Sequence, residues 1–364
     1  MEWSYKIGTI YGIPLRLHIT FPMLIIAYAA LFGYEYGLMA AFRGSILILL
    51  LFACVVLHEL AHSKQAQRYG VKVRDVTLLP IGGVSNMEHI PEDPQQELRI
   101  AIAGPAISFV IGIVLLMINL AAGLPVFDFN FEKIATSSSY IFVYLAWINI
   151  FLAFFNLLPA FPMDGGRVIR AYLAQRMSYI KATHIAATIG KIFAIIFGIV
   201  GFVINPILIF IAFFVYLGAS SEEQSVMVGE SLKGLRVKDV MNAQCVTIPA
   251  ETSLLALVEK IFHGSCRGVI LVTEEDQYVG LASQENILSA IHEHGLDIEV
   301  GKIAKRDLPT VSPEDRLDDI YRKMQRDQQR AYAVTDREEL VGIISLEDLG
   351  RAYSLVAALR SEKE

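Results

Sequence analysis

Long apolar segments fill the first 219 residues and limit the fold more than any other feature of the chain. About 20 mostly apolar residues cross the hydrocarbon core of a bilayer. Because a chain in lipid must satisfy its own backbone hydrogen bonds, such segments fold as helices. The sequence therefore predicts a multi-pass α-helical membrane protein with about six transmembrane helices. The predicted spans are residues 17–33, 43–64, 99–122, 140–160, 184–204 and 207–219.

Two parts of this region do not form simple spans. Residues 184–219 are interrupted only by an Asn-Pro pair, so they form either two spans joined by a tight turn or one kinked element. Residues 70–98 alternate apolar with polar side chains and contain Gly82 and Gly83. Since a period of two is typical of strands, we expect a short β-hairpin or a re-entrant strand pair there.

The composition changes near residue 220. With 54% hydrophobic and 19% charged residues, the chain is too apolar for a soluble protein and too charged for a pure membrane bundle. We expect a membrane domain over residues 1–219, a polar linker over 220–235 and a soluble domain over 236–364. The net charge of −6 argues against nucleic acid as a main partner.

Basic residues predict the orientation of the spans, because Lys and Arg concentrate in cytoplasmic loops. They gather after the second and fourth spans, whereas residues 34–42 and 123–139 contain few. We therefore expect a cell-membrane protein whose N-terminus and soluble domain are cytoplasmic. The basic residues concerned are Lys64, Arg68, Lys72, Arg74, Arg99, Arg167, Arg170, Arg176 and Lys181.

The second span ends in the motif HELAH, which starts at His58. On a helix, His58 and His62 lie one turn apart on the same face, a spacing at which two imidazoles can hold one zinc ion. Glu59 lies beside them, where it could take a proton from a zinc-bound water. Ionisable residues within a span mark functional sites, although these three could also be interfacial helix-end residues. Cys54 shares their face but fits better as a small buried residue.

A catalytic zinc usually has three protein ligands, so one more is expected. Asp164 is the best candidate, because it follows two prolines that break the fourth span, and broken helices in membranes line cavities or are buried in protein. The neighbouring Gly165 and Gly166 permit a close backbone approach. Alternatively, Asp164 caps the helix that starts near Gly165. Asn156 could bind backbone groups freed by the break, or could hydrogen-bond a substrate carbonyl or oxyanion.

These segments together resemble the site-2 protease family of intramembrane metalloproteases over about residues 5–220. The matching motifs are LHELAH, PIGGV, IAIAGPAIS and NLLPAFPMDGGR, in this order. The resemblance implies one zinc ion held by His58, His62 and Asp164, with Glu59 as general base and later general acid. It also implies that membrane proteins are the substrates and that their transmembrane helices are cut in regulated intramembrane proteolysis.

Such a reaction requires the substrate helix to unwind, since its peptide bonds are hidden in hydrogen bonds. The hairpin around Gly82 and Gly83 could receive the extended substrate as an added strand. It could equally be a membrane-embedded plug with no role in substrate binding.

Residues 236–355 contain an internal duplication. In each half, short β-runs surround amphipathic helices in the order β-α-β-β-α, and both halves end in a similar Gly-Leu/Ile-x-Ser-x-Glu pattern. This repeat resembles a tandem pair of cystathionine-β-synthase (CBS) domains, which implies an α/β fold. It also implies an adenosine nucleotide in the cleft between the halves and a homodimer formed through this module.

The resemblance suggests nucleotide contacts at Ser345 and Asp348 in the second half and at Ser283 in the first, where an Asn replaces the expected Asp. Thr247 and Thr310 could line the same cleft. Alternatively, Ser345 and Asp348 only cap the last helix. A nucleotide bound there could gate the access of substrates to the membrane domain.

Two other functions remain open at this point. CBS pairs also occur on ion transporters, so the chain could be a CBS-regulated metal or ion transporter with His58, Glu59, His62 and Asp164 as transport ligands. It could also be an inactive scaffold, although an intact Glu59 argues against that. We favour the protease.

Overall fold

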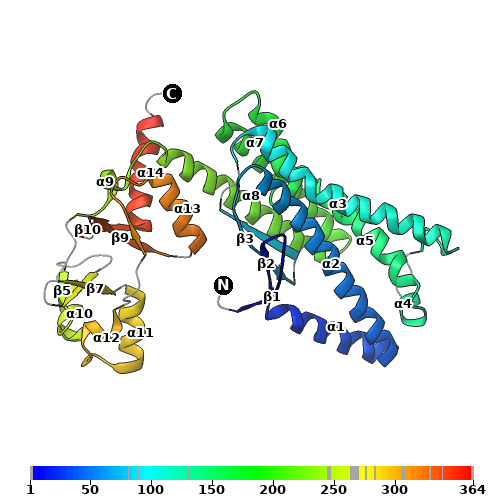
Figure 1. The fold of residues 1–364 in the computed structure, drawn as a ribbon, viewed down its shortest axis with the longest axis horizontal. Helices are drawn as coiled ribbons and strands as arrows, with labels where there is room; N and C mark the ends of the chain where they lie inside the picture. Colours follow the sequence, from blue (N-terminus) through cyan, green and yellow to red (C-terminus); the bar gives the residue numbers. More distant parts are fainter. Residues whose placement is uncertain are drawn as a thin grey trace. The chain divides into compact units, whose positions relative to one another are not determined.

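The computed structural model describes residues 3–80, 82–88, 91–128, 132–243, 247–262, 270–274, 277–282, 284–304, 309–327, 329–337 and 339–361. The chain divides into two compact units, Met1–Gln224 and Ser225–Glu364 (Figure 1). The division agrees with the change of composition near residue 220.

The first unit is a helical bundle with a small sheet against it. Its helices are α1 (Thr20–Tyr36), α2 (Leu38–Arg68), α3 (Pro94–Ala121), α4 (Glu132–Thr136), α5 (Tyr140–Asn156), α6 (Asp164–Ala174), α7 (Tyr179–Val203) and α8 (Ile207–Leu232). Helix α3 is central, because it packs against α2, α5 and α6 (Figure 1). The candidate ligands come from α2 and α6, so α3 contacts both of the helices that carry them.

Four strands form one sheet in the order β1-β2-β3-β4. The strands are β1 (Ser4–Ile10), β2 (Ile13–His18), β3 (Val73–Leu79) and β4 (Gly82–Met87). The expected hairpin is confirmed as the antiparallel pair β3–β4, which packs against α2. The second hairpin, β1–β2, was not predicted; β2 joins it to β3 in parallel. Because β2 extends to His18, the first predicted span begins later, at Thr20 of α1.

Four helices of the described residues are long and apolar enough to span a membrane, namely α2, α3, α7 and α8. Helices α1 and α5 are apolar but have 17 residues each. The count of six spans therefore stays a prediction. Helices α7 and α8 are separate and form a hairpin, since a Cβ on Gly201 would touch Ile209.

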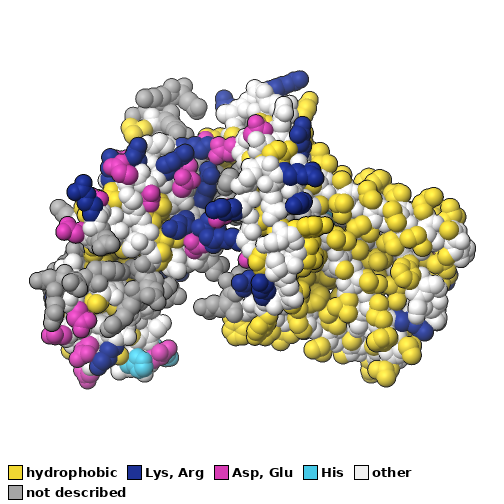
Figure 2. Space-filling view, viewed as in Figure 1, with side chains coloured by type: hydrophobic (Ala, Val, Ile, Leu, Met, Phe, Trp, Pro, Cys, Tyr) yellow, Lys and Arg dark blue, Asp and Glu magenta, His cyan; other side chains and the backbone are white. Residues whose placement is uncertain are grey.

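Apolar side chains cover most of the visible surface of the first unit, and Lys and Arg gather along one border of it (Figure 2). Such a surface would be unusual for a protein in water, because large exposed apolar patches mark binding or membrane contact. It fits helices surrounded by lipid. The exposed side chains include Leu31, Phe42, Leu49, Val110, Met117, Phe151, Ile199 and Phe210.

Helix α8 continues through most of the segment expected as a linker. Residues 220–232 belong to the same helix as residues 207–219, without a break. The carboxylate of Glu223 accepts hydrogen bonds from Lys191 and His184 of α7, so the polar stretch is packed rather than free. The linker of residues 220–235 is therefore mostly helix.

The second unit contains two similar α/β halves. The first half has α9 (Val237–Val240), β5 (Thr247–Pro249), α10 (Leu254–Phe262), β6 (Ile270–Glu274), β7 (Gln277–Ala282) and α11 (Gln284–His294). The second has α12 (Val300–Ile303), β8 (Thr310–Val311), α13 (Leu317–Asp327), β9 (Ala331–Asp336), β10 (Glu339–Ser345) and α14 (Leu346–Ser361). Each half contains a three-stranded sheet with one parallel and one antiparallel pair. This confirms the duplicated α/β fold.

Candidate metal centre

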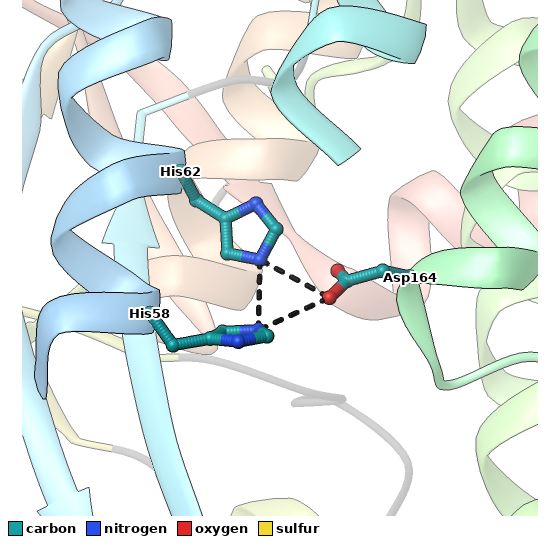
Figure 3. A group of neighbouring side chains, drawn as sticks. All are labelled: His58, His62 and Asp164. Carbon is teal, nitrogen blue, oxygen red and sulfur yellow. Dashed lines mark hydrogen bonds and ion pairs between the residues drawn. The ribbon is translucent and has the colours of Figure 1, made fainter. Parts of the chain in front are cut away.

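Three side chains from distant parts of the chain meet at one point in the first unit. Nε2 of His58 and Nε2 of His62 lie 3.2 Å apart, and Oδ2 of Asp164 lies 3.3 Å and 3.1 Å from them (Figure 3). Both histidines are buried, and Asp164 is partly buried. The structure thus brings together the three residues that the sequence proposed as metal ligands.

The two helices that carry these groups present them for different reasons. His58 and His62 are one turn apart on α2, so they project from the same face. Asp164 is the first residue of α6, and its carboxylate points to the histidines instead of capping the helix. The residue at the cap position is Met163, which has no side-chain cap. The capping alternative for Asp164 is therefore wrong.

Close backbone packing holds the start of α6 in place. A Cβ on Gly165 would overlap the carbonyl oxygens of Leu157 and Leu158, and one on Gly166 would lie 2.6 Å from the backbone nitrogen of Phe161. Only glycine leaves room for such an approach. These two glycines let α6 fold back against the end of the preceding helix and carry Asp164 to the site.

Helix α3 supplies the partner of each histidine. Nδ1 of His62 lies 2.6 Å from the carbonyl oxygen of Ile100, and Nδ1 of His58 lies 2.9 Å from Oγ of Ser108. Residues that orient the second nitrogen of a metal-binding histidine fix its tautomer and ring direction. Neither partner was predicted from the sequence, although Ser108 is a polar residue within the apolar run IAIAGPAIS.

Gly104 lies between Ile100 and Ser108 on α3. The three residues follow at intervals of four, so they form one stripe along the same face of the helix. A Cβ at this position would overlap Nε2 of His62 and would lie 2.6 Å from Nε2 of His58. The absent side chain therefore leaves the space into which both imidazole nitrogens point.

The chemistry of these three groups makes this a candidate cation site. A carbonyl can only accept, so the Ile100 contact places a hydrogen on Nδ1 of His62, and in the neutral imidazole the lone pair is then on Nε2. With Ser108 accepting from His58, that lone pair, its counterpart on His58 and the Asp164 carboxylate face one another. Three acceptors repel one another unless a cation binds between them, and two imidazoles with a carboxylate suit zinc.

Glu59 lies next to this group, against the sheet. A Cβ on Gly83 of β4 would lie 2.5 Å from Cγ of Glu59, so the strand backbone touches that side chain. Glu59 is partly buried and has no part in the three-residue cluster. Its carboxylate is thus adjacent to the cation position and free of a ligand role there.

Two other candidates near the site have local partners. Nδ2 of Asn156 donates to the carbonyl oxygen of Leu152 at 3.0 Å, within its own helix. Cys54 is buried in a hydrophobic cluster with Leu47 and Leu145, and the cluster of candidate metal ligands does not include it. The oxyanion role of Asn156 stays a prediction, and the interpretation of Cys54 as a buried core residue agrees with its packing.

The candidate nucleotide residues in the second unit are partly engaged. The carboxylate of Asp348 accepts hydrogen bonds from the backbone nitrogen of Ser345 at 2.9 Å, from Oγ of Ser345 and from Arg351. Such contacts are those of a helix cap. Thr247 and Thr310 are exposed at the starts of their strands, and Ser283 lies outside the described residues.

Comparison with known proteins covers both units. The profile of peptidase family M50 matches residues 46–199, and that of the CBS domain matches residues 237–293 and 300–355. A zinc metalloprotease of Methanocaldococcus jannaschii is 38% identical over 359 residues, 98% of each chain. The Mycobacterium tuberculosis protein Rip3 is 31% identical over 328 residues, 86% of this chain and 81% of that one. The solved site-2 protease of M. jannaschii is 44% identical and covers 61% of this chain and 95% of that chain, with a TM-score of 0.45.

Proposed function

We propose that this chain, which belongs to peptidase family M50 and is a zinc metalloprotease, holds its zinc ion on His58, His62 and Asp164. The observation that carries this assignment is that the Nε2 atoms of two imidazoles and a carboxylate oxygen meet in one small space. When bound there, zinc supplies the Lewis acidity that makes a water molecule nucleophilic at neutral pH.

We propose that Glu59 carries out the proton transfers of the reaction. Its carboxylate takes a proton from the attacking water and later gives it to the leaving amine, so it is general base and then general acid. It follows His58 directly on α2, beside the ligands but not among them. A carboxylate in that place can move a proton without leaving the zinc short of a ligand. We retain Asn156 as a candidate donor to the substrate carbonyl, because its helix ends close to α6.

We further propose that the substrate binds as an extended strand along β4. This strand is at an edge of the sheet, and its Gly83 backbone touches Glu59. An edge strand offers unpaired backbone groups that an unwound helix can use for its own hydrogen bonds. The replacement Val84→Pro would remove one backbone donor from β4, and unchanged cleavage by both Val84→Pro and Gly82→Pro would reject the role of this strand.

The substrate class follows from the family and the surface of the first unit. Intramembrane proteases act on membrane proteins, and apolar side chains surround the helices that carry the site. We propose transmembrane helices of other proteins as substrates. We also propose a cell-membrane location with the basic border and the CBS pair in the cytoplasm, since Lys and Arg concentrate on that side.

The CBS pair is the proposed regulatory part. We propose that it binds an adenosine nucleotide, forms a homodimer and changes the rate of cleavage. Thr247, Ser283, Thr310, Ser345 and Asp348 remain the candidate contacts. Titration of AMP and ATP into a cleavage assay tests the regulation, and a flat response to both would remove it.

The transporter alternative gains no support from the comparisons, since the relatives that cover the membrane domain include named zinc metalloproteases. The first experiment is the zinc content of detergent-purified wild type, His58→Ala and Asp164→Ala. We expect about one zinc per chain in the wild type and much less in both variants. Zinc retained by Asp164→Ala would remove this residue from the ligand set, and a folded wild type without zinc would contradict the site.

A further inference from the structure

Arg170 is a fully buried cation in the helix that carries Asp164. Its side chain is 1% exposed. Nε and Nη2 donate to Oε1 of Glu97 on α3 at 2.8 Å and 2.5 Å, and Nη1 donates to Oε1 of Glu222 on α8 at 2.6 Å. The guanidinium also lies 4.9 Å from the ring centres of Phe161 and Tyr179. One side chain therefore ties together three helices.

A buried ion pair is by itself weak support for a stabilising role, because desolvation of the charges offsets much of their attraction. The planar guanidinium of an Arg side chain also has a geometric effect. Donors held in one plane set the distance and angle between the groups that they join. Arg170 therefore fixes how α6 lies against α3.

That geometry matters because of what the two helices carry. Glu97 is one turn before Ile100, on the same stripe of α3 that holds Gly104 and Ser108 against the histidines. Arg170 is on the same helix as Asp164. The contact between Arg170 and Glu97 thus joins the helix that orients both imidazoles to the helix that supplies the carboxylate.

Glu222, the second carboxylate that Arg170 contacts, is on α8. This helix runs on to Leu232, and Val228 and Leu232 pack in a hydrophobic cluster of the second unit. A displacement or rotation of α8 would pull on the Arg170 guanidinium. Because that side chain is buried among charged and aromatic partners, it cannot relax into solvent.

We propose that Glu97, Arg170 and Glu222 form a positioning network that sets the distance between Asp164 and the two histidines and links it to α8. The inference rests on the proposed zinc ligands. It assigns these three residues no contact with substrate and no role in proton transfer. It identifies a route by which a change in the second unit reaches the metal site through a helix common to both.

The test measures metal binding rather than cleavage. Apo protein in detergent is titrated with Zn²⁺ against a competing chelator and with Co²⁺, whose visible absorption reports coordination geometry. The variants are Glu97→Gln and Glu222→Gln, which keep the size of the side chain. Glu223→Gln is the matched control, because Glu223 pairs with Lys191 and His184 of α7 instead of Arg170. Melting temperatures are measured in parallel.

We expect Glu97→Gln to weaken zinc binding about tenfold, the lower end of what outer partners of a metal site contribute, and to change the Co²⁺ spectrum. Glu222→Gln should act in the same direction but less, since its side chain is 28% exposed against 1% for Glu97. Glu223→Gln should match the wild type. If a Glu variant does not fold, Arg170→Lys serves instead, because a single ammonium keeps the charge but loses the fork.

Wild-type zinc affinity and wild-type Co²⁺ spectra in both Glu97→Gln and Glu222→Gln would overturn the inference, even if their melting temperatures fell. That result differs from failure of the proposed function, which would appear as no zinc in the wild type or as zinc retained by Asp164→Ala.

Discussion

The carbonyl oxygen of Ile100 lies 2.6 Å from Nδ1 of His62. Since a carbonyl has no proton to donate, this contact places a hydrogen on Nδ1, so in the neutral imidazole the lone pair is on Nε2. Nε2 faces the carboxylate of Asp164, which is the first residue of another helix, α6. A backbone atom therefore orients one of the three proposed metal ligands.

Replacement of Glu59 by Gln should separate chemistry from metal binding. An amide keeps the shape of the side chain but cannot accept a proton, so cleavage of a reconstituted membrane-protein substrate should fall at least about 100-fold. Zinc content should stay at the wild-type level. His58→Ala is the companion variant, in which both activity and zinc should be lost. Cleavage at the wild-type rate by Glu59→Gln would exclude this residue as the base.

Replacement of Gly104 by Ala should abolish zinc binding. The added methyl group would overlap Nε2 of His62 and crowd Nε2 of His58, so it would occupy the space needed by the ion. Gly198→Ala in α7 is the matched control, because its Cβ would meet only Ala212 at 3.8 Å. Elemental analysis of both purified proteins checks the prediction. Equal zinc in the two variants would mean that the ion binds elsewhere.

Loss of the Ser108 hydroxyl should weaken the metal site without destroying it. Ser108→Ala leaves Nδ1 of His58 without its partner, and such outer contacts contribute about 10- to 100-fold in metal affinity. Ser45→Ala is a suitable control, since the Ser45 hydroxyl bonds only to Ala41 in its own helix. Chelator competition gives both dissociation constants. The prediction is wrong if the two variants bind zinc equally well.

Removal of zinc should lower the melting temperature of the wild type but not that of Asp164→Ala. A ligand that binds only the folded state stabilises it by about 4 kcal/mol when present at about 1,000 times its dissociation constant. Thermal unfolding with and without a chelator measures the difference. A chelator effect of the same size in both proteins would show that the stabilising ion does not use Asp164.

Removal of the Asp348 carboxylate tests its two proposed roles together. Asp348→Ala loses the carboxylate that accepts from the backbone nitrogen and hydroxyl of Ser345 at the start of α14, and should lower the free energy of unfolding by about 1 kcal/mol. If the carboxylate also holds a ribose, AMP should raise the melting temperature of the wild type but not that of the variant. Asp315→Ala is the control, since Asp315 caps a different segment by accepting from the Ser312 backbone. An undiminished AMP response in Asp348→Ala would leave only the capping role.

The three residues that meet at the candidate metal centre could be picked out from the sequence because their signals are local or chemically rare. Two histidines at a spacing of four seldom occur by chance within an apolar run, and Asp164 follows a break that only buried or cavity-lining backbone tolerates. The partners of the histidines could not be predicted. One is a backbone carbonyl, which leaves no trace in a sequence, and the other is a serine whose register on α3 depends on helix packing.

The fold differs from the prediction in the sheet and in residues 220–232, and in both places the structure depends on partners that are distant in the sequence. The strand pairing of β2 with β3 joins segments more than 50 residues apart, and nothing local in residues 13–18 specifies that partner. Residues 220–232 were expected as a linker because charged side chains usually face water. Here Glu222 and Glu223 are paired with cations on neighbouring helices, so their polarity marks a contact instead of an exposed segment.

The residues of α3 that face the histidines restrict which sequence changes this helix can accept during evolution. Ile100, Gly104 and Ser108 succeed one another at intervals of four residues and meet the two histidines in turn. Substitution of the outer, lipid-facing residues of this helix leaves that alignment intact. A single inserted or deleted residue between Ile100 and Ser108 would rotate the rest of the helix by about 100° and carry the serine away from His58. The outer face of α3 can therefore vary in composition, whereas the spacing of the residues that face the histidines has to stay the same.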